Sequence, residues 1–247
     1  MEHGPVYLIG GGWVEAAFPG TYGRFAAAAG RQGAPRIACV LLDEPDRDAY
    51  LARSVAAFAA GGVGDIFPVF VSAERPLRRD DLESASGVLV GGGLTPAYHD
   101  AIVPEAATWR PWLRERGIPY AGFSAGAMIA PERGIIGGWK LRRGDGELAI
   151  CSEDVSEDEE FLDVRPGLGL VPFALDVHAS QYGTPTRLLH AVASGAVAEG
   201  WAVDEDTMVA CEDGRITVHG LGSAYRVRRG DGCLAVEIVG DGESRDA

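Results

Sequence analysis

Short apolar runs alternate with helical stretches along the first half of the chain. The apolar runs, which are predicted to be buried strands, lie at residues 6–9, 37–42, 66–71 and 87–90, and one more leads into Ser124. Helical stretches are predicted at residues 21–29, 47–60, 96–102 and 109–116. Strands that alternate with helices form βαβ units, so the sequence predicts an α/β fold with a doubly wound, mostly parallel sheet. In such sheets the ligand crevice lies beyond the carboxyl ends of the strands.

The second half of the chain has a different pattern. A polar and acidic segment at residues 142–160 is predicted to be a solvated loop, and residues 168–175 are predicted to be another buried strand. Five short β segments are expected after Gly200, at residues 201–203, 208–211, 215–218, 224–227 and 234–239. The dipeptides Asp213-Gly214 and Asp231-Gly232 are typical of hairpin turns. With no linker or repeat, we expect one α/β domain over residues 1–240, with a β-rich C-terminal extension, and a disordered tail at 241–247.

The composition indicates a soluble globular protein. The 247 residues are 47% hydrophobic and 23% charged, and the formal net charge is -14. Nucleic acids and anionic membranes bind basic patches, so neither is expected as a partner. The first five residues lack the basic and apolar segments of a signal peptide, and no apolar run is long enough to span a membrane. The four cysteines form no Cys-x-x-Cys pair, which favours free thiols and a cytoplasmic location.

The strand that leads into Ser124 is followed at once by small residues. Gly122 and Gly126 flank the serine in the pattern Gly-x-Ser-x-Gly. This pattern is typical of the nucleophile elbow, a strand-turn-helix whose strained turn exposes the serine hydroxyl beside a backbone N–H. Glycines are needed there because neighbouring chains approach more closely than a Cβ permits. Ser124 is therefore the candidate nucleophile, and a small-residue turn with an incidental serine is the alternative.

A serine nucleophile needs a base that takes its proton. Among the five histidines, His178 directly follows a predicted buried strand, at the sheet edge where Ser124 is also expected. His99, six residues after a glycine run, is a candidate lining residue of the cleft. His178 is the predicted base, and a hydrogen-bonded structural histidine is the alternative.

Two glycine runs follow predicted strands at the same edge. The run at residues 91–93 can supply backbone N–H groups, so Gly92 or Gly93 together with Ala125 is predicted to form an oxyanion hole. The run at residues 10–12 lacks the third glycine of the Gly-x-Gly-x-x-Gly spacing, which disfavours a dinucleotide site.

Several of these segments, in this order, resemble the dipeptidase E / cyanophycinase family of serine peptidases. The resemblance runs from about Val6 to about Val227 and rests on these segments: Gly91-Gly92-Gly93-Leu94-Thr95, Gly122-Phe123-Ser124-Ala125-Gly126-Ala127, Gly169-Leu170-Val171-Pro172, Asp176-Val177-His178, Arg187-Leu188-Leu189 and Trp201-Ala202-Val203-Asp204-Glu205-Asp206-Thr207. It implies a flavodoxin-like fold related to class I glutamine amidotransferases. It also implies Ser124 as nucleophile, His178 as general base, and the Gly92 region with Ala125 as oxyanion donors. Family members are often dimers, which implies a homodimer.

The chain departs from the family pattern at several positions. Leu94 stands where family members usually carry Asn or Asp, and Tyr182 and Thr184 stand where cyanophycinases have two further arginines. These departures disfavour a pocket for an arginine-decorated polyaspartate. In dipeptidase E-like enzymes a nearby arginine recognises an acidic substrate side chain through paired hydrogen bonds. Arg187 and Thr95 are thus candidate substrate-binding residues, and a capping or bridging role is the alternative for Arg187.

The resemblance does not identify the acidic member of a triad. In the family this acid lies in the segment after the elbow helix, and this chain has no carboxylate there. Asp176 lies two residues before His178, and strand alternation would point both side chains to one face. Glu205 or its neighbour Asp204, in the following β segment, and the acidic loop around Glu157 are the other candidates.

The sequence leads to one main functional hypothesis and two rivals. The main hypothesis is a cytosolic serine peptidase-like hydrolase that cleaves amide bonds of small peptides, as an exopeptidase, dipeptidase or isopeptidase, through Ser124 and His178. It requires no metal or cofactor. The first rival is a catalytically weak or silent module with a glutamine amidotransferase-like fold that binds a small molecule or peptide. The second rival, a glutamine amidotransferase, is disfavoured because that chemistry wants cysteine at the elbow.

Overall fold

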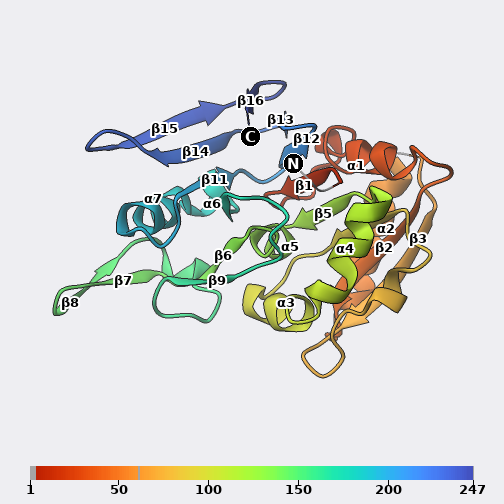
Figure 1. Ribbon diagram of the computed structural model, residues 1–247, viewed down its shortest axis with the longest axis horizontal. Coiled ribbons are helices and arrows are strands. Elements are labelled where there is room, and N and C mark those ends of the chain that lie inside the picture. Colours follow the sequence, from red (N-terminus) through yellow and green to blue (C-terminus); the bar gives the residue numbers. More distant parts are fainter. Residues whose placement is uncertain (1–3, 61, 247) are drawn as a thin grey trace.

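The computed structural model describes residues 4–60 and 62–246, and its largest element is a mixed β-sheet (Figure 1). Within these residues, eight strands pair in the order β16-β13-β12-β1-β5-β4-β2-β3. Five run parallel: β1 (Val6–Ile9), β5 (Tyr120–Phe123), β4 (Gly87–Val90), β2 (Arg36–Leu42) and β3 (Asp65–Val71). Three continue the sheet beyond β1 in antiparallel pairs: β12 (Thr207–Glu212), β13 (Arg215–Gly220) and β16 (Ser244–Asp246). The predicted α/β fold with a large, mostly parallel sheet is confirmed.

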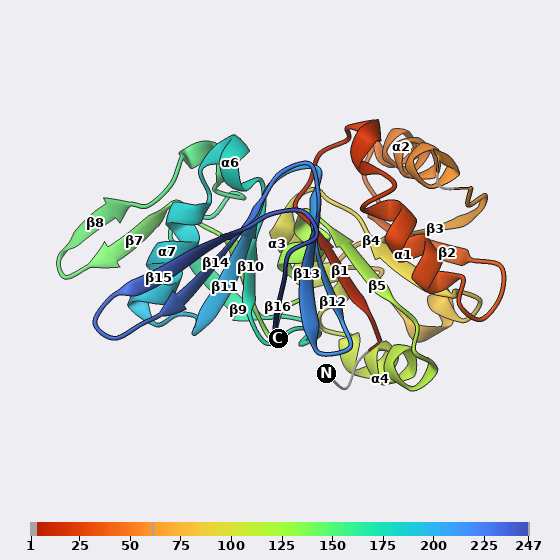
Figure 2. The ribbon, with the colours of Figure 1, turned by 90° about the horizontal axis from the view of Figure 1, so that it is seen from above.

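Helices cover both faces of the parallel part of the sheet (Figure 2). One face carries α1 (Tyr22–Ala29) and α2 (Arg47–Ala60), and the other carries α3 (Thr95–Ile102) and α4 (Ala106–Arg116). In β1, Tyr7 belongs to the apolar core beneath α1 and α2, whereas Leu8 belongs to the core on the opposite face. Burial of both faces accounts for the continuous apolar runs of these strands. No helix in the described part of the chain is long and apolar enough to cross a membrane.

Apart from β12, β13 and β16, the chain after β5 builds a second layer beside the large sheet (Figure 1). Its main sheet has the order β10 (Ala174–Asp176), β11 (Glu199–Val203), β14 (Ala224–Arg229) and β15 (Leu234–Val239), and α7 (Pro185–Ser194) packs on it. Two small antiparallel sheets pair β6 (Arg133–Gly137) with β9 (Asp163–Pro166), and β7 (Lys140–Arg143) with β8 (Gly146–Ala149). Two one-turn helices, α5 (Ala125–Met128) and α6 (Ala179–Tyr182), follow β5 and β10. Both predicted Asp-Gly turns connect antiparallel strands, β12 to β13 and β14 to β15.

The acidic segment differs from its prediction as a solvated loop. Its first residues belong to the hairpin of β7 and β8, and Lys140, at the start of that hairpin, forms ion pairs with Glu147 (3.2 Å) and Glu160 (2.8 Å). Charged side chains that pair across neighbouring segments make ordered structure compatible with a polar sequence. The polar sequence therefore correctly predicted that this segment is exposed, but it did not predict the strands.

Two further boundaries differ from their predictions. The strand predicted at residues 168–175 begins only at Ala174. Before it, the N–H groups of Leu168 and Leu170 donate to the carbonyls of Ile129 (2.8 Å) and Ala130 (2.9 Å), after α5, and not to a neighbouring strand. The tail predicted to be disordered from residue 241 contains β16, which pairs with β13, and Arg245 Nε donates to Glu237 Oε2 (2.9 Å). Residues 1–3, part of the segment tested for a signal peptide, and residue 247 lie outside the described residues.

The carboxyl ends of β1, β5 and β4 meet at one edge of the sheet, because these strands are parallel neighbours. The Gly10–Gly12 run, Ser124 and the Gly91–Gly93 run follow them directly. Backbone hydrogen bonds join the three loops, from the Ser124 N–H to the Ile9 carbonyl (2.9 Å) and from the Gly126 N–H to the Gly91 carbonyl (3.0 Å). The fold thus gathers the predicted site residues of the first half of the chain.

The close approach of backbones at Gly126 generates a stability prediction. A Cβ built on Gly126 lies 2.4 Å from the Val90 carbonyl oxygen, so backbone must move to admit it. Helix propensity favours alanine over glycine by about 1 kcal/mol. A net loss of stability in Gly126→Ala would therefore come from the contact between the new Cβ and the Val90 carbonyl. We expect Gly126→Ala to lower the free energy of unfolding in urea by about 1–3 kcal/mol. Gly240→Ala is the control, because a Cβ there meets nothing within 4 Å. Equal unfolding free energies for the two variants would contradict the prediction.

Candidate active site

Ser124 stands in the sharp turn between β5 and α5. Its backbone angles are φ 50° and ψ −110°, which a residue with a Cβ rarely adopts and which cost energy. The Ala127 and Met128 N–H groups donate to the Ser124 carbonyl (2.9 and 3.0 Å) and begin the helix directly after the turn. Ser124 also lines a cavity at the sheet edge. The turn has the strained strand-turn-helix geometry that the glycine-flanked sequence predicts.

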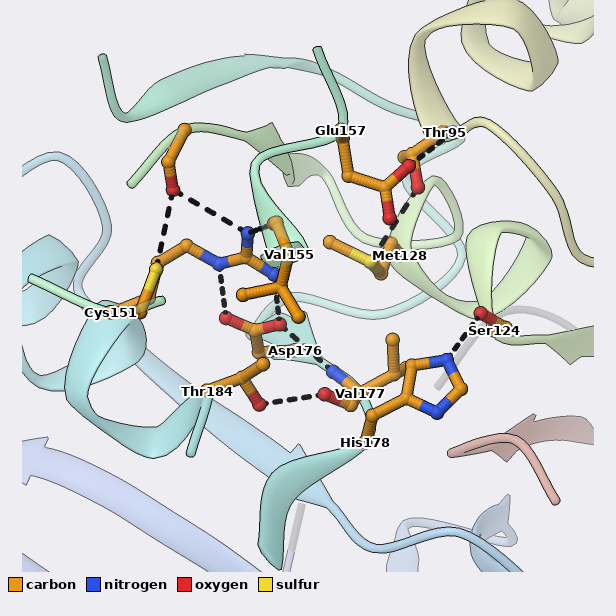
Figure 3. A network of polar contacts seen from close by, with 12 residues as sticks. Thr95, Ser124, Met128, Cys151, Val155, Glu157, Asp176, Val177, His178 and Thr184 are labelled. Carbon is orange, nitrogen blue, oxygen red and sulfur yellow. Dashed lines mark hydrogen bonds and ion pairs between the residues drawn. The ribbon is translucent and has the colours of Figure 1, made fainter. Parts of the chain in front are cut away.

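His178 reaches Ser124 from the second layer of the structure (Figure 3). It follows β10 and has left-handed backbone angles, φ 54° and ψ 41°, where α6 begins. The His178 N–H donates to the Gly10 carbonyl (3.0 Å), which joins the two layers directly at the site. His178 Nε2 lies 2.9 Å from Ser124 Oγ. Two residues 54 positions apart in the sequence are thus within hydrogen-bond distance.

The glycine run after β1 makes room for the imidazole. Gly11 has φ 112°, and a Cβ built on it would lie 2.3 Å from His178 Cε1. Any side chain at this position would displace the ring. This contact accounts for a glycine run that lacks the dinucleotide spacing.

A carboxylate faces the other imidazole nitrogen. His178 Nδ1 lies 2.8 Å from Glu205 Oε1, just after β11. The Glu205 N–H donates to Gln181 Oε1 (3.0 Å), which fixes the backbone that carries the carboxylate. The side chains of His178 and Glu205 are 25% and 29% exposed. Ser124, His178 and Glu205 therefore form a continuous chain of hydrogen-bond distances, which begins at the cavity wall with Ser124.

A buried ion pair lies behind His178 (Figure 3). Arg187 in α7 donates from Nε to Asp176 Oδ2 (2.8 Å) and from Nη2 to Asp176 Oδ1 (2.7 Å), and both side chains are buried. Asp176 Oδ1 also accepts the Val177 N–H (3.0 Å). The Thr184 hydroxyl donates to the Val177 carbonyl (2.6 Å). The residue before His178 is therefore held through both its N–H and its carbonyl.

The same guanidinium holds the loop that follows β8. Arg187 Nη1 donates to the Val155 carbonyl (2.5 Å) and lies 3.5 Å from the Gly138 carbonyl. Two residues further on, Glu157 Oε2 accepts the Thr95 N–H (2.8 Å) at the start of α3. Burial is the main cause that raises the pKa of Glu157, and the hydrogen bond from Thr95 opposes it.

Several predicted site residues have other partners in the structure. The candidate triad acid Asp176 pairs with Arg187 and not with His178. Arg187 is 1% exposed with its guanidinium in contact with protein groups, so the predicted contact with a substrate carboxylate is wrong. Thr95 is fully buried, with its hydroxyl 3.7 Å from Met128 Sδ, and it cannot contact a substrate either. The acidic-loop candidate Glu157 bonds to the Thr95 backbone. Side-chain burial, which cannot be read from the sequence, accounts for Asp176, Arg187 and Thr95, and a tertiary hydrogen bond accounts for Glu157.

The predicted oxyanion donors are not equivalent. The Ala125 N–H belongs to the first turn of α5, where helix N–H groups lack intrahelical acceptors. Neither this N–H nor that of Gly93 donates to an acceptor in the described part of the chain. The Gly92 N–H, in contrast, donates to the Tyr50 hydroxyl (2.7 Å). The prediction for Gly92 therefore needs correction, because its N–H already has an acceptor.

A cavity of about 310 Å³ opens beside Ser124. Its apolar walls come from the end of β2, from Phe123 and from the rings of Tyr50 and Tyr98, and charged side chains of residues 44–53 surround it. Trp13 packs on Phe123 with ring centroids 4.7 Å apart and makes an edge contact with Tyr50 at 5.5 Å. The cavity is thus a small cleft with both apolar and charged lining residues, and the serine is part of its wall.

Tyr50 is a site residue that the sequence analysis missed. It stands in the first turns of α2, just after the carboxyl end of β2, and doubly wound sheets place that point at the ligand crevice. Its position relative to the strand was the available signal. The candidate lining residue His99 instead contacts the Pro166 carbonyl through Nε2 (2.9 Å) and Asp100 through Nδ1 (3.1 Å). Over residues 4–60 and 62–246, no group of three His, Cys, Asp or Glu side chains could hold a metal ion.

Comparison with known proteins finds a solved structure with a similar fold. The crystal structure of a peptidase from an acI-B1 Actinobacterium is similar to this chain, with a TM-score of 0.67 and 14% sequence identity. The similarity covers 99% of this chain and 97% of that chain. No protein-family model matches the sequence, and no curated protein matches it. This chain therefore shares the fold of a solved peptidase along its whole length.

The buried ion pair generates a second stability prediction. Arg187→Met keeps an unbranched apolar stem and leaves the Asp176 carboxylate buried without its partner. Because breaking a buried pair costs about 3–5 kcal/mol, we expect the free energy of unfolding in urea to fall by that amount. Arg36→Met is the control, since the Arg36–Asp65 pair is exposed (44% and 54%) and such pairs contribute at most about 1 kcal/mol. Similar losses in both variants would show that the buried pair does not stabilise the fold in this way.

Proposed function

We propose that this protein is a serine peptidase-like hydrolase that cleaves amide bonds of small peptides. The contact chain from Ser124 Oγ through His178 (2.9 Å) to Glu205 Oε1 (2.8 Å) carries the proposal. A working triad needs a base in contact with the nucleophile and a third group that orients the base. The fold shared with a solved peptidase supports the same conclusion. Membership of the dipeptidase E / cyanophycinase group, with its flavodoxin-like fold, is part of this proposal.

In the proposed reaction Ser124 Oγ attacks the amide carbonyl carbon while its proton passes to His178 Nε2. The carbonyl electron pair moves onto the oxygen, and the N–H groups of Ala125 and Gly93 donate hydrogen bonds to this oxyanion. The intermediate then collapses, the C–N bond breaks, and the leaving amine takes the proton from His178. An acyl-serine remains.

Water completes the reaction through the same groups. His178 removes a proton from the water as its oxygen attacks the acyl carbon, and returns that proton to Ser124 Oγ when the C–O bond breaks. A carboxylic acid leaves and the serine is regenerated. Glu205 holds the imidazole by Nδ1 in the orientation that both steps need and stabilises the imidazolium. The proposed sequence uses only side chains and backbone groups of this chain.

The cavity supports a small peptide as the substrate. At about 310 Å³ it lies at the lower end of ligand pockets, which span about 300–1,000 Å³. Such a volume suits one or two residues on the acyl side of the scissile bond. An exopeptidase, dipeptidase or isopeptidase fits this size. Selectivity for acidic residues is not part of the proposal, because Arg187 is buried.

Fluorophosphonate labelling tests the proposed nucleophile. We expect the reagent to label the wild-type protein at Ser124, as located by mass mapping, because only an activated serine reacts. We expect Ser124→Ala and His178→Ala to abolish labelling while both variants stay folded, since neither side chain belongs to the apolar core. No labelling of a folded wild-type sample would instead favour a silent binding module with this fold.

The role of Glu205 can be measured with the same reagent. Glu205→Gln keeps the shape of the side chain but removes the charge that pairs with His178. We expect the labelling rate constant to fall by at least about 100-fold, since the equivalent change in a well-studied triad lowers kcat by about 10⁴. Asp206→Asn is the control, because in the described part of the chain the Asp206 side chain accepts a hydrogen bond from the Val14 N–H alone, and an amide oxygen can do the same. A Glu205→Gln rate equal to that of Asp206→Asn would exclude Glu205 as the triad acid.

A further inference from the structure

Tyr50 brings a side-chain hydroxyl to the wall of the cavity that Ser124 also lines. Its oxygen accepts the Gly92 N–H at 2.7 Å. While this bond is in place, the Gly92 N–H cannot donate to an oxyanion. A backbone donor expected at this position is thus replaced by a side chain that stands in front of it.

A phenol hydroxyl that accepts a hydrogen bond keeps its own proton for donation. Among the described residues, no acceptor takes the Tyr50 proton. The bond from Gly92 polarises the hydroxyl and makes it a stronger donor, as in other hydrogen-bond chains. Burial is the main cause that raises the pKa of Tyr50 well above its usual value, so the hydroxyl stays neutral at neutral pH and retains this proton.

The hydroxyl lies close to the reacting atoms. A Cβ built on Gly92 would lie 3.0 Å from Ser124 Cβ and 3.1 Å from the Tyr50 oxygen. The Tyr50 oxygen and Ser124 Cβ are therefore no more than about 6 Å apart, the two distances added. The oxyanion is bonded to the carbon that Ser124 Oγ attacks, so it lies two covalent bonds away from Oγ. An effective donor lies about 2.7–3.1 Å from the oxyanion. The hydroxyl is within reach of that position.

The ring of Tyr50 is held independently of its hydroxyl. Trp13 and Phe123 make edge contacts with it, with ring centroids 5.5 and 6.3 Å away. Aromatic contacts of this kind depend on the ring and not on the hydroxyl. Removal of the oxygen should therefore leave the ring in place.

We propose that the Tyr50 hydroxyl is an oxyanion-hole donor, acting beside the Ala125 N–H and in place of the Gly92 N–H. The inference rests on the proposed hydrolase function. When Ser124 Oγ bonds to the carbonyl carbon, the electron pair moves to the carbonyl oxygen, and Tyr50 donates a hydrogen bond to it. Tyr50 keeps its proton throughout, because His178 takes the proton of Ser124.

The test compares Tyr50→Phe with Tyr22→Phe. Tyr22 belongs to the same aromatic cluster, and its hydroxyl is buried without a hydrogen-bond partner in the described part of the chain. Two probes are used, the fluorophosphonate and the activated ester p-nitrophenyl acetate. Loss of one oxyanion donor lowers kcat by about 10²–10³, so we expect Tyr50→Phe to lose at least about 100-fold in labelling rate and ester kcat, with KM unchanged. Tyr22→Phe should retain the wild-type rates.

A second variant separates donation from a structural effect. Incorporation of 3,5-difluorotyrosine at position 50 keeps the hydroxyl and makes it more acidic, so a donor should raise the labelling rate severalfold. An unchanged rate in this variant, or a Tyr50→Phe effect on KM alone, would overturn the inference.

The remaining outcomes also decide the inference. A faster Tyr50→Phe enzyme would overturn it and show that the hydroxyl blocks the Gly92 N–H. If the wild-type protein is labelled and Tyr50→Phe matches it, the inference fails and the proposed function stands. If the folded wild type is not labelled, the proposed function fails and the inference falls with it.

Discussion

The Asp176–Arg187 ion pair links the catalytic candidates to the rest of the second layer. Burying two charges costs several kcal/mol unless hydrogen bonds satisfy the groups. Here both carboxylate oxygens accept from the guanidinium, and one also accepts the Val177 N–H. The remaining guanidinium nitrogen bonds to the Val155 carbonyl. A single buried arginine thus fixes the strand end that carries His178, the helix α7 and the loop after β8, and the position of the imidazole depends on all three.

Two residues whose side chains meet at the site both have a strained backbone. Ser124 and His178 both have positive φ angles, which cost energy and persist only where the surroundings determine them. At Ser124 the surroundings are the paired loops after β1 and β4, with Gly126 pressed against the backbone of β4. At His178 they are the ion pair behind it and the Gly10 carbonyl in front. Because the two sets of contacts come from different layers, the 2.9 Å contact between the side chains depends on how the layers pack.

The sequence predicts the parts of this arrangement that follow from local patterns. Apolar runs and glycine-flanked Ser124 predict the parallel strands and the elbow, because each pattern reflects the environment of its own segment. The structure places predicted residues Ser124 and His178 within hydrogen-bond distance, although their separation along the chain carries no geometric signal. The roles of Arg187 and Thr95 were wrongly predicted, because a polar side chain looks the same in the sequence whether it lines a cleft or is buried. Tyr50 was missed because its hydroxyl acquires its partner only through tertiary contact with Gly92.

Two carboxylates lie near His178, Asp176 two residues before it and Glu205 in contact with its imidazole, and their environments differ. Asp176 is fully buried and already saturated by Arg187 and a backbone N–H, so contact with the imidazole would require it to abandon a buried cation at a cost of several kcal/mol. Glu205 is partly exposed, pairs with no Lys or Arg side chain among the described residues, and has an oxygen 2.8 Å from Nδ1. A carboxylate in that position can stabilise an imidazolium as the charge appears during reaction. Proximity in the sequence favours Asp176, whereas the contact with Nδ1 favours Glu205 as the proposed orienting carboxylate. The proposed oxyanion donors differ in the same way, because the Gly92 N–H already has an acceptor and the Ala125 N–H has none in the described part of the chain.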